Sequence, residues 1–542
     1  MKNIIVTCAL PYANGDLHLG HILEQIQADI WVRFQRMQGN TCYFISADDT
    51  HGTPIMLKAN ELGITPEELI AINYDRHIAC SKAFSIEFDN YDSTNSVTNK
   101  NLVYDIYSKL QEKHTITEKA ISQLFDVKKQ MFLPDRYIKG ICPKCGSKDQ
   151  YGDNCESCGA SYDTTDIIDP ISVISNTTPE LRNTIHYFFT LSNYTNFLRD
   201  YLQKSKLSID AINKMQEWLN TGLQDWNISR DEPYFGFLIP NTTNKYFYVW
   251  LDAPIGYIAS LVNLCNNQNL SLDMWNSDQT QIYHFFGKDI LYFHALFWIA
   301  ILHVANYKLP SGLFVHGFLT LNGQKMSKSK GNYISVEDFL KTQISPQLFR
   351  YYIASKLSSK IEDIDFTMND FALKINSELV GKFINIIART ANFMQKFFNN
   401  TLAGNLLDDT LCLQVRNDSN IIKEYFYERE YAKALRHIAT LNDSINTYID
   451  TLKPWIIAKQ INPTSNLQEN SNEYLELHQI CTNVINAIKY ISIYLKPVIP
   501  EIIKDVESYL NIKSLQWTDL DDILLNHQIN DYKHIISRLD KC

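Results

Sequence analysis

The sequence predicts an α/β fold in which a parallel-sheet part is split by a metal-binding insertion and followed by an all-helical part. Three observations predict this. Residues 4–8 and 42–45 are near-continuous apolar runs, typical of strands buried on both faces of a parallel sheet. Four cysteines in two close pairs occur in a segment that lacks the strand–helix rhythm. From residue 371 onward, only helical periodicity remains.

Composition bounds the class of protein. A chain of 542 residues with 45% hydrophobic and 20% charged residues is typical of a soluble protein of several domains. We expect no signal peptide, and the longest apolar run, residues 291–305, is interrupted by two histidines and too short to span a membrane. Eleven cysteines, four of them clustered, favour a reducing cytoplasm over a disulfide framework. The net charge of −10 argues against a general nucleic-acid coat protein but leaves one folded RNA partner open.

The predicted strand at residues 4–8 leads through a glycine-bearing loop at 11–21, PYANGDLHLGH, into an amphipathic helix that Gly39 should end. Free N–H groups and the positive end of the helix dipole make the start of such a helix a seat for phosphate. We expect Asp16 to cap this helix. The loop, called the histidine loop below, is therefore a candidate nucleotide site.

His18 and His21 are the chemically active groups of the histidine loop. Three residues apart, they lie on one face of the first turn and can donate hydrogen bonds to one anion. Gly20 between them leaves room for a flat base against the backbone. Taken alone, the pattern also fits a metal pair or a core histidine, although no third nearby ligand favours the metal.

A second candidate nucleotide segment is residues 325–329, KMSKS, called the lysine loop below. A strand at residues 315–321 and a tight turn at Asn322 and Gly323 precede it, and Ser335 is expected to cap the next helix. Small residues make the loop adaptable, so it can close over a bound nucleotide. Taken alone, a lysine–serine loop is more often a solvated turn.

The four clustered cysteines form two knuckles, Cys142-x-x-Cys145-Gly and Cys155-x-x-Cys158-Gly. Four thiolates close a tetrahedral shell and leave no position for water, so the metal should be structural rather than catalytic. Zinc is the leading interpretation, and a redox dithiol or an iron–sulfur cluster are the alternatives.

The strand at residues 42–45 runs into Asp48, Asp49 and His51, which would project at the carboxyl edge of the sheet. A carboxylate there can pair with a substrate ammonium group, and a helix cap or turn is an equally good interpretation.

Residues 245–257, KYFYVWLDAPIGY, are predicted to begin as an aromatic strand that breaks at Pro254 and Gly256, and residues 287–298 to form a helix. Core packing explains most of these aromatic residues.

Together, the histidine and lysine loops resemble the paired nucleotide-binding motifs of class I aminoacyl-tRNA synthetases. The stretches ALPYANG, HLGH and WLDAPIGY are similar to the methionyl enzymes of that class. The resemblance implies a Rossmann-like parallel-sheet catalytic domain, split by a zinc-binding insertion and followed by an all-α anticodon-binding helix bundle. It implies these boundaries: catalytic halves at 1–112 and 229–321, the connective insertion at 113–228, the KMSKS loop and linking (stem-contact) domain at 322–370, and the anticodon-binding bundle at 371–542.

The resemblance implies a methionine–tRNA ligase activity. L-methionine would react with ATP, accompanied by Mg²⁺, to give methionyl-adenylate and pyrophosphate, and the methionyl group would pass to the 3′ end of tRNA(Met) with its CAU anticodon. The nucleophile is already a carboxylate, so catalysis would be positioning and charge stabilisation. The residues expected to act in catalysis are His18, His21, Lys325 and Lys328. The residues expected to bind ATP are Asn14, Gly15, His18, Gly20, His21, Lys325, Met326, Ser327, Lys328 and Ser329.

Methionine needs a hydrophobic slot, because a thioether is a poor hydrogen-bond acceptor and prefers aromatic neighbours. The resemblance assigns the substrate amine to Asp49, and we expect Tyr257 and His294 each to donate a hydrogen bond to the sulfur. The expected methionine-binding residues are Leu10, Tyr12, Asp49, Trp250, Ala253, Pro254, Tyr257, Ile290 and His294.

In the helical part, Asn385 and Arg389 are four residues apart, and Pro454 and Trp455 begin another helix. From the residues alone, a core tryptophan and a solvated Asn/Arg pair are favoured. The resemblance instead implies that an unpaired anticodon base stacks on Trp455 while Asn385 and Arg389 bond to base edges.

Two rival functions remain open: a class I synthetase for another amino acid, such as cysteine or leucine, and a catalytically silent tRNA-binding paralogue. The WLDAPIGY stretch and the single compact insertion argue against the first, and the intact histidines and lysines against the second. A small nucleotidyltransferase would not need the bundle. Nothing resembles the extra β-barrel tRNA-binding and dimerising domain of some methionyl enzymes, so we expect a monomer. The cysteine pattern favours a cytoplasmic location.

Overall fold

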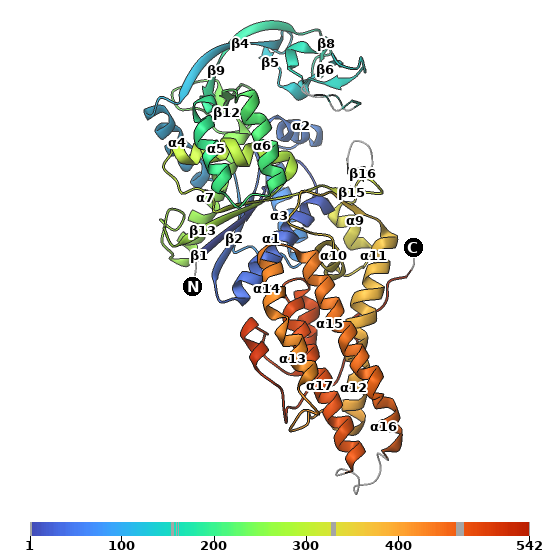
Figure 1. Ribbon diagram of the computed structural model, residues 1–542. Helices are drawn as coiled ribbons and strands as arrows, with labels where there is room; N and C mark the ends of the chain where they lie inside the picture. Colours follow the sequence, from blue (N-terminus) through green and yellow to red (C-terminus); the bar gives the residue numbers. More distant parts are fainter. Residues whose placement is uncertain are drawn as a thin grey trace.

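The computed structural model of the protein describes residues 3–152, 155, 157–158, 160, 162–326, 332–461 and 471–540. It confirms the predicted α/β class with a helical C-terminal region. Figure 1 shows the sheet and its helices in the middle, the strands of the insertion above them and a long bundle of helices below. None of the helices in the described residues combines the length and apolarity that a bilayer crossing requires.

A five-stranded sheet, in which all neighbouring strands are parallel, forms the centre of the α/β part. Its order is β14–β13–β1–β2–β3. The chain adds strands on one side of β1 first and on the other side only after the insertion, so the topological switch lies between β1 and β13, where open α/β sheets bind ligands. The strands are β1 (Asn3–Cys8), β2 (Thr41–Asp48), β3 (Asn90–Ser93), β13 (Thr280–Gly287) and β14 (Gly312–His316).

Helix α7 packs against β2 and β3, and α4 packs on α7, whereas α1 packs against β1, β2 and β13 and also contacts the bundle. α1 ends at Met37, and Gly39 just beyond its cap has the left-handed φ of 78°, which confirms the predicted stop. The helices of this part are α1 (Leu19–Met37), α2 (Thr53–Leu62), α3 (Pro66–Ala83), α4 (Val97–Glu112), α7 (Val249–Gln268) and α8 (Trp298–Val304).

The segment at residues 245–257 differs from its prediction. Only Lys245–Phe247 forms a strand, β12, and α7 then runs through Pro254 without the predicted break. Pro254 lies in the second turn, where its missing N–H removes a single helical hydrogen bond. From Leu251 to Leu261 every residue of α7 is buried, so the sequence lacks the periodicity that separates a helix from a buried strand.

The predicted strand at residues 315–321 is two strands in different sheets. β14 ends at His316, and β15 pairs instead with β16 and β17. Gly317 lies at the break, where a Cβ would be 2.1 Å from the carbonyl oxygen of Glu362. The helix predicted at residues 287–298 consists of a 3-10 turn at Lys288–Ile290 and a π-helical turn at Phe293–Phe297, which leads into α8. The three strands are β15 (Leu319–Leu321), β16 (Gln324–Lys325) and β17 (Ile364–Phe366).

The insertion contains a long antiparallel ribbon formed by β4 and β9. A small sheet of order β7–β6–β8 has the cysteine knuckles in the connections on either side of β7. The strands and α-helices between α4 and β12 are β4 (Ile116–Asp126), β5 (Met131–Phe132), β6 (Ile138–Ile141), β7 (Gln150–Tyr151), β8 (Ile168–Ser172), β9 (Glu180–Phe189), α5 (Thr195–Lys204), α6 (Ile209–Thr221), β10 (Trp226–Asn227) and β11 (Ser229–Asp231).

The helical part is a bundle around α17, which packs against α12, α13, α15 and α16. α17 is buried on all sides from Ile480 to Leu495. One cluster of buried apolar side chains joins β1, α1 and the bundle, so the α/β part and the bundle share a core. The helices are α9 (Val336–Lys341), α10 (Pro346–Ala354), α11 (Met368–Lys374), α12 (Asn385–Phe397), α13 (Thr410–Asn417), α14 (Ser419–Tyr427), α15 (Tyr431–Leu452), α16 (Pro454–Gln460), α17 (Asn472–Leu495) and α18 (Pro500–Leu510).

Candidate active site

A cavity of about 590 Å³ opens at the carboxyl ends of β1 and β13, at the topological switch of the sheet. A second cavity of about 210 Å³ adjoins it along the histidine loop. The first cavity brings together residues that the sequence analysis assigned to different ligands: Leu10, Tyr12, His18, Gly20, His21, Asp49, Trp250, Ile290 and Met326.

The two histidines cap α1 themselves. His18 is the N-cap, and its Nδ1 accepts the N–H of Gly20 at 3.1 Å, while Nδ1 of His21 accepts the N–H of His18 at 3.1 Å. In the neutral form of each ring, the proton is therefore on Nε2. The rings stack with their centres 3.8 Å apart, so both present this nitrogen from one face of the helix start.

This arrangement corrects the prediction that Asp16 caps the helix. α1 begins only at Leu19, and Asp16 lies 3.3 Å from Arg76 instead. Gly20 is needed for the histidine cap, because a Cβ there would lie 2.8 Å from Cε1 of the His18 ring. Histidine is an unusual cap, which is why the sequence pointed to the nearby aspartate.

The histidine loop is held from behind by α3. His77 places Nδ1 2.8 Å from Oδ1 of Asp48 and Nε2 2.9 Å from the carbonyl oxygen of Gly15, so both ring nitrogens face acceptors. Burial lowers the pKa of His77, but the hydrogen bond and charge of Asp48 outweigh burial and raise it. Asn73 adds a bond of 2.7 Å to the carbonyl of Ala13. The sequence analysis missed these supports because nothing local marks them.

Asp49 lines the cavity and has one buried, unsatisfied carboxylate oxygen. Its Oδ1 is buried and, among the residues that the structure describes, has no hydrogen-bond partner. Burial, followed by the charges of Asp252 and Asp48, raises the pKa of Asp49 well above its usual range. A buried carboxylate without a neighbouring positive charge is costly, and a positively charged ligand would relieve that cost. His51 instead pairs with Asp252 at 2.5 Å and does not line the cavity.

The apolar side of the cavity is formed by Leu10, Trp250 and Ile290. The Trp250 ring stacks on Phe293 with the ring centres 3.9 Å apart, so the π-helical turn supports the cavity wall. Four other predicted methionine residues do not line the cavity and are buried behind this wall: Ala253, Pro254, Tyr257 and His294.

Tyr257 and His294 bond to each other. The Tyr257 hydroxyl lies 2.9 Å from Nε2 of His294, and Nδ1 of that ring lies 3.1 Å from the carbonyl oxygen of Ile290. Burial lowers the pKa of His294 to about 4, so the ring is neutral and its one proton goes to the carbonyl. Neither of the two expected donors therefore has a hydrogen left for a sulfur atom in this arrangement.

A polar part of the cavity was missed by the sequence analysis. Nε2 of His316 lies 3.2 Å from the Glu24 carboxylate, and Arg230 stacks 3.7 Å above the Tyr248 ring. Glu24 follows His21 by one helical turn on α1, a signal that the sequence offered. His316 ends β14 at the carboxyl edge of the sheet, but the prediction carried that strand past it.

A segment that follows the lysine loop lies against the histidine loop. Ile334 accepts the N–H of Leu19 at 3.2 Å, and Val336 donates to the carbonyl of Leu17 at 2.9 Å. Within the lysine loop, Met326 lines both cavities, which the histidine loop also lines. The described residues downstream of the lysine loop are therefore anchored at the histidine loop.

Within the lysine-loop hairpin, Asn322 and Gly323 both have positive φ, which confirms the tight turn. Ser335 caps α9 by accepting the N–H of Asp338 at 3.0 Å, as predicted. The backbone of Lys325 lies in β16, whereas Ser327, Lys328 and Ser329 lie outside the described residues.

The four cysteine sulfurs form one cluster, all within 4.8 Å of one another. Cys142 and Cys158 are 3.9 Å apart and Cys145 and Cys155 are 3.5 Å apart, close to the edge of about 3.8 Å that a tetrahedron of zinc–sulfur bonds has. Backbone N–H groups of both knuckles point at sulfur, as in the bond of 3.4 Å from Cys158 to Cys155. The donor set fits a four-coordinate metal.

A separate cavity of about 420 Å³ lies in the bundle, between α12, α16 and α17. Of the four predicted anticodon residues, Arg389, Pro454 and Trp455 line it, with the Arg389 guanidinium 5.5 Å from the Trp455 ring centre. Asn385 is exposed and does not line it. α16 begins at Pro454 as predicted, and Figure 1 places it at the end of the bundle away from the sheet.

Comparison with known proteins gives a consistent result. The model of the family described as "tRNA synthetases class I (M)" matches residues 4–391. The methionine–tRNA ligase of Chromobacterium violaceum is 49% identical over 99% of this chain and 78% of its own length. That of Neisseria meningitidis serogroup C is 48% identical, over 100% of this chain and 79% of its own. The solved Mycobacterium tuberculosis methionyl-tRNA synthetase in complex with methionyl-adenylate shares the fold, with a TM-score of 0.80 at 22% identity over 98% of each chain. The chain therefore belongs to the class I tRNA synthetases, in the group that the family model designates M.

Proposed function

We propose that the protein is a methionine–tRNA ligase (EC 6.1.1.10). It activates L-methionine with ATP to methionyl-adenylate and pyrophosphate, and transfers the methionyl group to the 3′ end of tRNA(Met). One observation carries this proposal: Asp49, whose carboxylate has a buried oxygen without a hydrogen-bond partner in the described part of the chain, lines the same cavity as the stacked pair His18 and His21. A site for an ammonium group and a site for a phosphate thus share one cavity, as the formation of an aminoacyl-adenylate requires.

In the first step, the methionine carboxylate attacks the α-phosphorus of ATP, and the bond to the β-phosphate breaks to release pyrophosphate. Nε2–H of His18 and of His21 donates to the phosphate oxygens on which charge develops, aided by the dipole of α1. Lys325 and Lys328 neutralise the departing pyrophosphate, and Mg²⁺ accompanies ATP. The other residues that we propose to hold ATP are Asn14, Gly15, Gly20, Met326, Ser327 and Ser329.

The methionine ammonium group pairs with Asp49, and its side chain enters the apolar side of the cavity beside Leu10, Trp250 and Ile290. Tyr12 borders the ammonium site. The buried residues Ala253, Pro254, Tyr257 and His294 shape this wall from behind. A direct bond from Tyr257 or His294 to the sulfur requires the hydrogen bond between them to open.

This proposal is tested by ATP–pyrophosphate exchange over a panel of amino acids. Methionine should support exchange, whereas leucine and cysteine should not. Exchange with one of those instead would favour a synthetase for another amino acid. No exchange with any amino acid, together with tRNA binding, would favour the silent paralogue.

We propose that the cysteine cluster holds one structural zinc ion. Cys145→Ala should abolish zinc binding and loosen the sheet of β6, β7 and β8, because a structural zinc contributes folding free energy directly. Metal analysis and limited proteolysis of the insertion would measure both effects. Cys265→Ala, at a cysteine in α7 away from the cluster, is the control and should keep zinc. A Cys145→Ala protein with full zinc content, or a wild-type protein that holds iron, would contradict the proposal.

We propose that the bundle cavity binds the CAU anticodon, with Asn385, Arg389, Pro454 and Trp455 contacting it. Trp455→Ala should lower kcat/KM for tRNA charging by roughly 10- to 100-fold, since stacking of one base contributes about 1–3 kcal/mol. Pyrophosphate exchange should stay near its wild-type rate, because the adenylate forms in the other cavity. Trp218→Ala, at an exposed tryptophan of α6, is the control. Equal losses of exchange and charging by Trp455→Ala would indicate misfolding and sink the assignment.

The division of the chain at residues 1–112, 113–228, 229–321, 322–370 and 371–542 is part of this proposal. The break of the parallel sheet between β3 and β13 supports the position of the insertion. That the protein works as a monomer in the cytoplasm stays a prediction.

A further inference from the structure

α1 connects the active-site cavity to the bundle. Its N-terminal end carries His18 and His21 at the cavity. Farther along, Gln27 accepts a bond of 3.0 Å from the Tyr431 hydroxyl of α15, and the indole of Trp31 donates to the carbonyl of Tyr427 at 3.2 Å. A displacement of the bundle would therefore displace α1.

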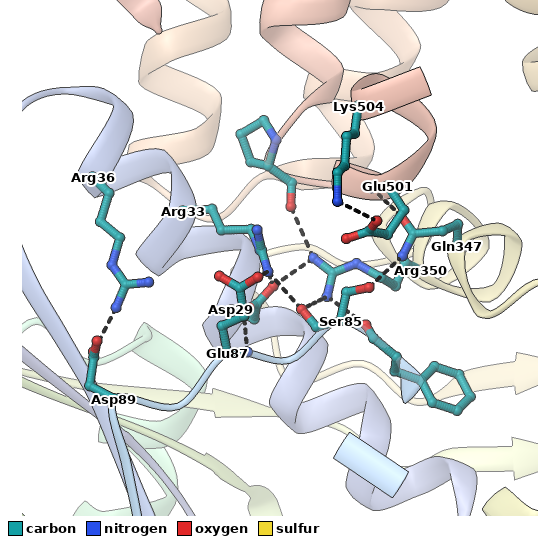
Figure 2. Close-up of polar contacts among 12 residues, drawn as sticks. Asp29, Arg33, Arg36, Ser85, Glu87, Asp89, Gln347, Arg350, Glu501 and Lys504 are labelled. Atoms are coloured by element: carbon teal, nitrogen blue, oxygen red, sulfur yellow. Dashed lines mark hydrogen bonds and ion pairs between the residues drawn. The ribbon is translucent and has the colours of Figure 1, made fainter. Parts of the chain in front are cut away.

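A third contact with α1 is made by Arg350 of α10, whose side chain is fully buried. Nη2 lies 2.7 Å from Asp29 of α1 and 3.0 Å from the carbonyl of Pro497. Nε donates to the carbonyl of Val498 at 2.7 Å, and Nη1 to that of Phe84 at 3.1 Å. One planar guanidinium thus joins α1, the end of α3 and the α17–α18 junction, and Figure 2 shows it between Asp29 and Ser85.

Asp29 is equally well bonded. Its Oδ2 accepts from Nε of Arg33 and from Arg350, both at 2.7 Å, and its Oδ1 accepts the N–H of Glu87 at 3.2 Å. Burial raises the pKa of Asp29, but the charges of Arg33 and Arg350 outweigh burial and lower it. A buried ion pair of this kind contributes little more to stability than apolar residues of the same volume, but it fixes geometry.

The contacts of Arg350 with Pro497 and Val498 connect it to α17, which lines the bundle cavity. Pro497 and Val498 directly follow α17, and α17 lines that cavity with Ile480, Cys481 and Val484. Between these points α17 is buried on all sides, so it is packed against its neighbours along this whole length. The contacts therefore run from the bundle cavity along α17 to Arg350, and from Arg350 through Asp29 and α1 to the histidines.

We propose that Arg350 is a positioning residue that couples RNA bound at the bundle cavity to the adenylate bound in the active-site cavity. The proposal rests on the proposed function and names the contact through which its two sites communicate. If Arg350 only held the fold together, its loss would weaken each site on its own, without changing the effect of one ligand on the other.

The coupling is measured as a ratio of two affinities. An RNA stem–loop with a CAU anticodon is titrated into the full-length protein, without and with saturating 5′-O-[N-(L-methionyl)sulfamoyl]adenosine, a stable adenylate analogue. We expect the analogue to change the Kd of the wild-type protein for the stem–loop by about fivefold or more, within the range common for coupled sites. In Arg350→Met, the change should shrink to less than about twofold.

Arg350→Lys is a second variant, which keeps the test decisive if Arg350→Met does not fold. It keeps a positive charge beside Asp29, but an ammonium group cannot reach Asp29, Phe84 and Val498 together as the guanidinium does. It should fold and still lose the coupling.

Arg36→Met is the matched control on the same helix. Arg36 pairs with Asp89 at 2.6 Å and donates to the carbonyl of Cys42 at 3.0 Å, both within the α/β part, and Figure 2 shows this pair apart from Arg350. Its coupling ratio should equal that of the wild type, and pyrophosphate exchange should stay near the wild-type rate in all three variants.

A wild-type ratio of one, or a wild-type ratio retained in Arg350→Met or Arg350→Lys, would overturn the proposal. A ratio lost equally in Arg36→Met would also overturn it, because any disturbance of α1 would then suffice. Methionine-dependent exchange by the wild-type protein, measured first, decides the proposed function separately.

Discussion

Replacing His21 by alanine is expected to lower kcat for methionine-dependent ATP–pyrophosphate exchange by about 10²–10³-fold, the usual effect of removing one preorganised donor. The cap bond from the His18 N–H to Nδ1 of His21 fixes which nitrogen of the His21 ring carries the proton. The stacked rings hold the two donors in place before ATP binds. Because the donor acts on charge that develops in the transition state, the KM values should change far less than kcat.

His21 also completes a capping box of α1, so the loss of a helix cap has to be separated from the loss of a donor. Thr65 provides the matched control, because with Glu68 it forms the capping box of α3 and does not line the cavity. Thr65→Ala should cost about 1 kcal/mol of stability and leave exchange near the wild-type rate. If Thr65→Ala and His21→Ala lowered exchange equally, a direct role for His21 would be wrong.

Asp49→Asn is expected to raise the KM for methionine on the order of 10²–10³-fold while leaving the KM for ATP nearly unchanged. Asparagine keeps the shape of the side chain but removes the charge that the ammonium group needs, and truncating one partner of a buried charge pair costs about 2–5 kcal/mol. Exchange at several methionine concentrations measures this effect.

The stability of the same variant should move in the opposite direction. The pKa of Asp49 is raised in the folded protein, so ionising this group costs folding free energy at any pH above its ordinary value of about 3.9. Asp49→Asn removes that cost, and its thermal midpoint at neutral pH should equal or exceed that of the wild type. A loss of methionine affinity therefore cannot be attributed to unfolding.

A change on the substrate side completes the test of Asp49. The 2-hydroxy analogue of methionine lacks the ammonium group and should inhibit the wild-type protein far more weakly than an amine-bearing analogue such as methioninol. In Asp49→Asn the two inhibitors should differ much less, as expected when the two changes remove one interaction. The same preference for the amine in both proteins would show that Asp49 does not bind the ammonium group.

The parts of the fold that the sequence predicted are those specified by local chemistry. Continuous apolar runs marked β1 and β2, Gly39 marked the end of α1, and Asn322 with Gly323 marked the lysine-loop turn. The spacing of the cysteine knuckles predicted that four sulfurs come together. In each case, neighbouring residues decide the outcome.

The predictions that failed depended on contacts across the fold. The first residues of α7 were predicted to continue a strand that breaks at Pro254 and Gly256, because burial of the helix on all sides erases its periodicity. Gly317 divides the strand at 315–321 because the backbone of Glu362 passes beside it, which no local pattern announces. His18 rather than Asp16 is the N-cap of α1, because the side chain of His21, three residues later, completes a capping box with His18.

Site residues that belong to a local sequence motif were predicted, whereas site residues that depend on contacts between distant parts of the chain were missed. Glu24, His77 and His316 form hydrogen bonds with residues that are far away in sequence. Of these three, only Glu24 had a local signal, because it follows His21 by one helical turn. Tyr257 and His294 were predicted to bind methionine, but neither lines the cavity, and the hydrogen bond between them could not be read from the sequence.

The central claim is that one cavity holds methionine and ATP so that both nucleotide loops act on the same triphosphate. The most direct measurement is a crystal structure with the methionyl sulfamoyl adenosine analogue and pyrophosphate. The account predicts the amine at Asp49, the sulfamoyl group at Nε2 of His18 and His21, and Lys325 and Lys328 on the pyrophosphate. An analogue bound with its amine away from Asp49, or a pyrophosphate contacted by only one of the two loops, would contradict the account.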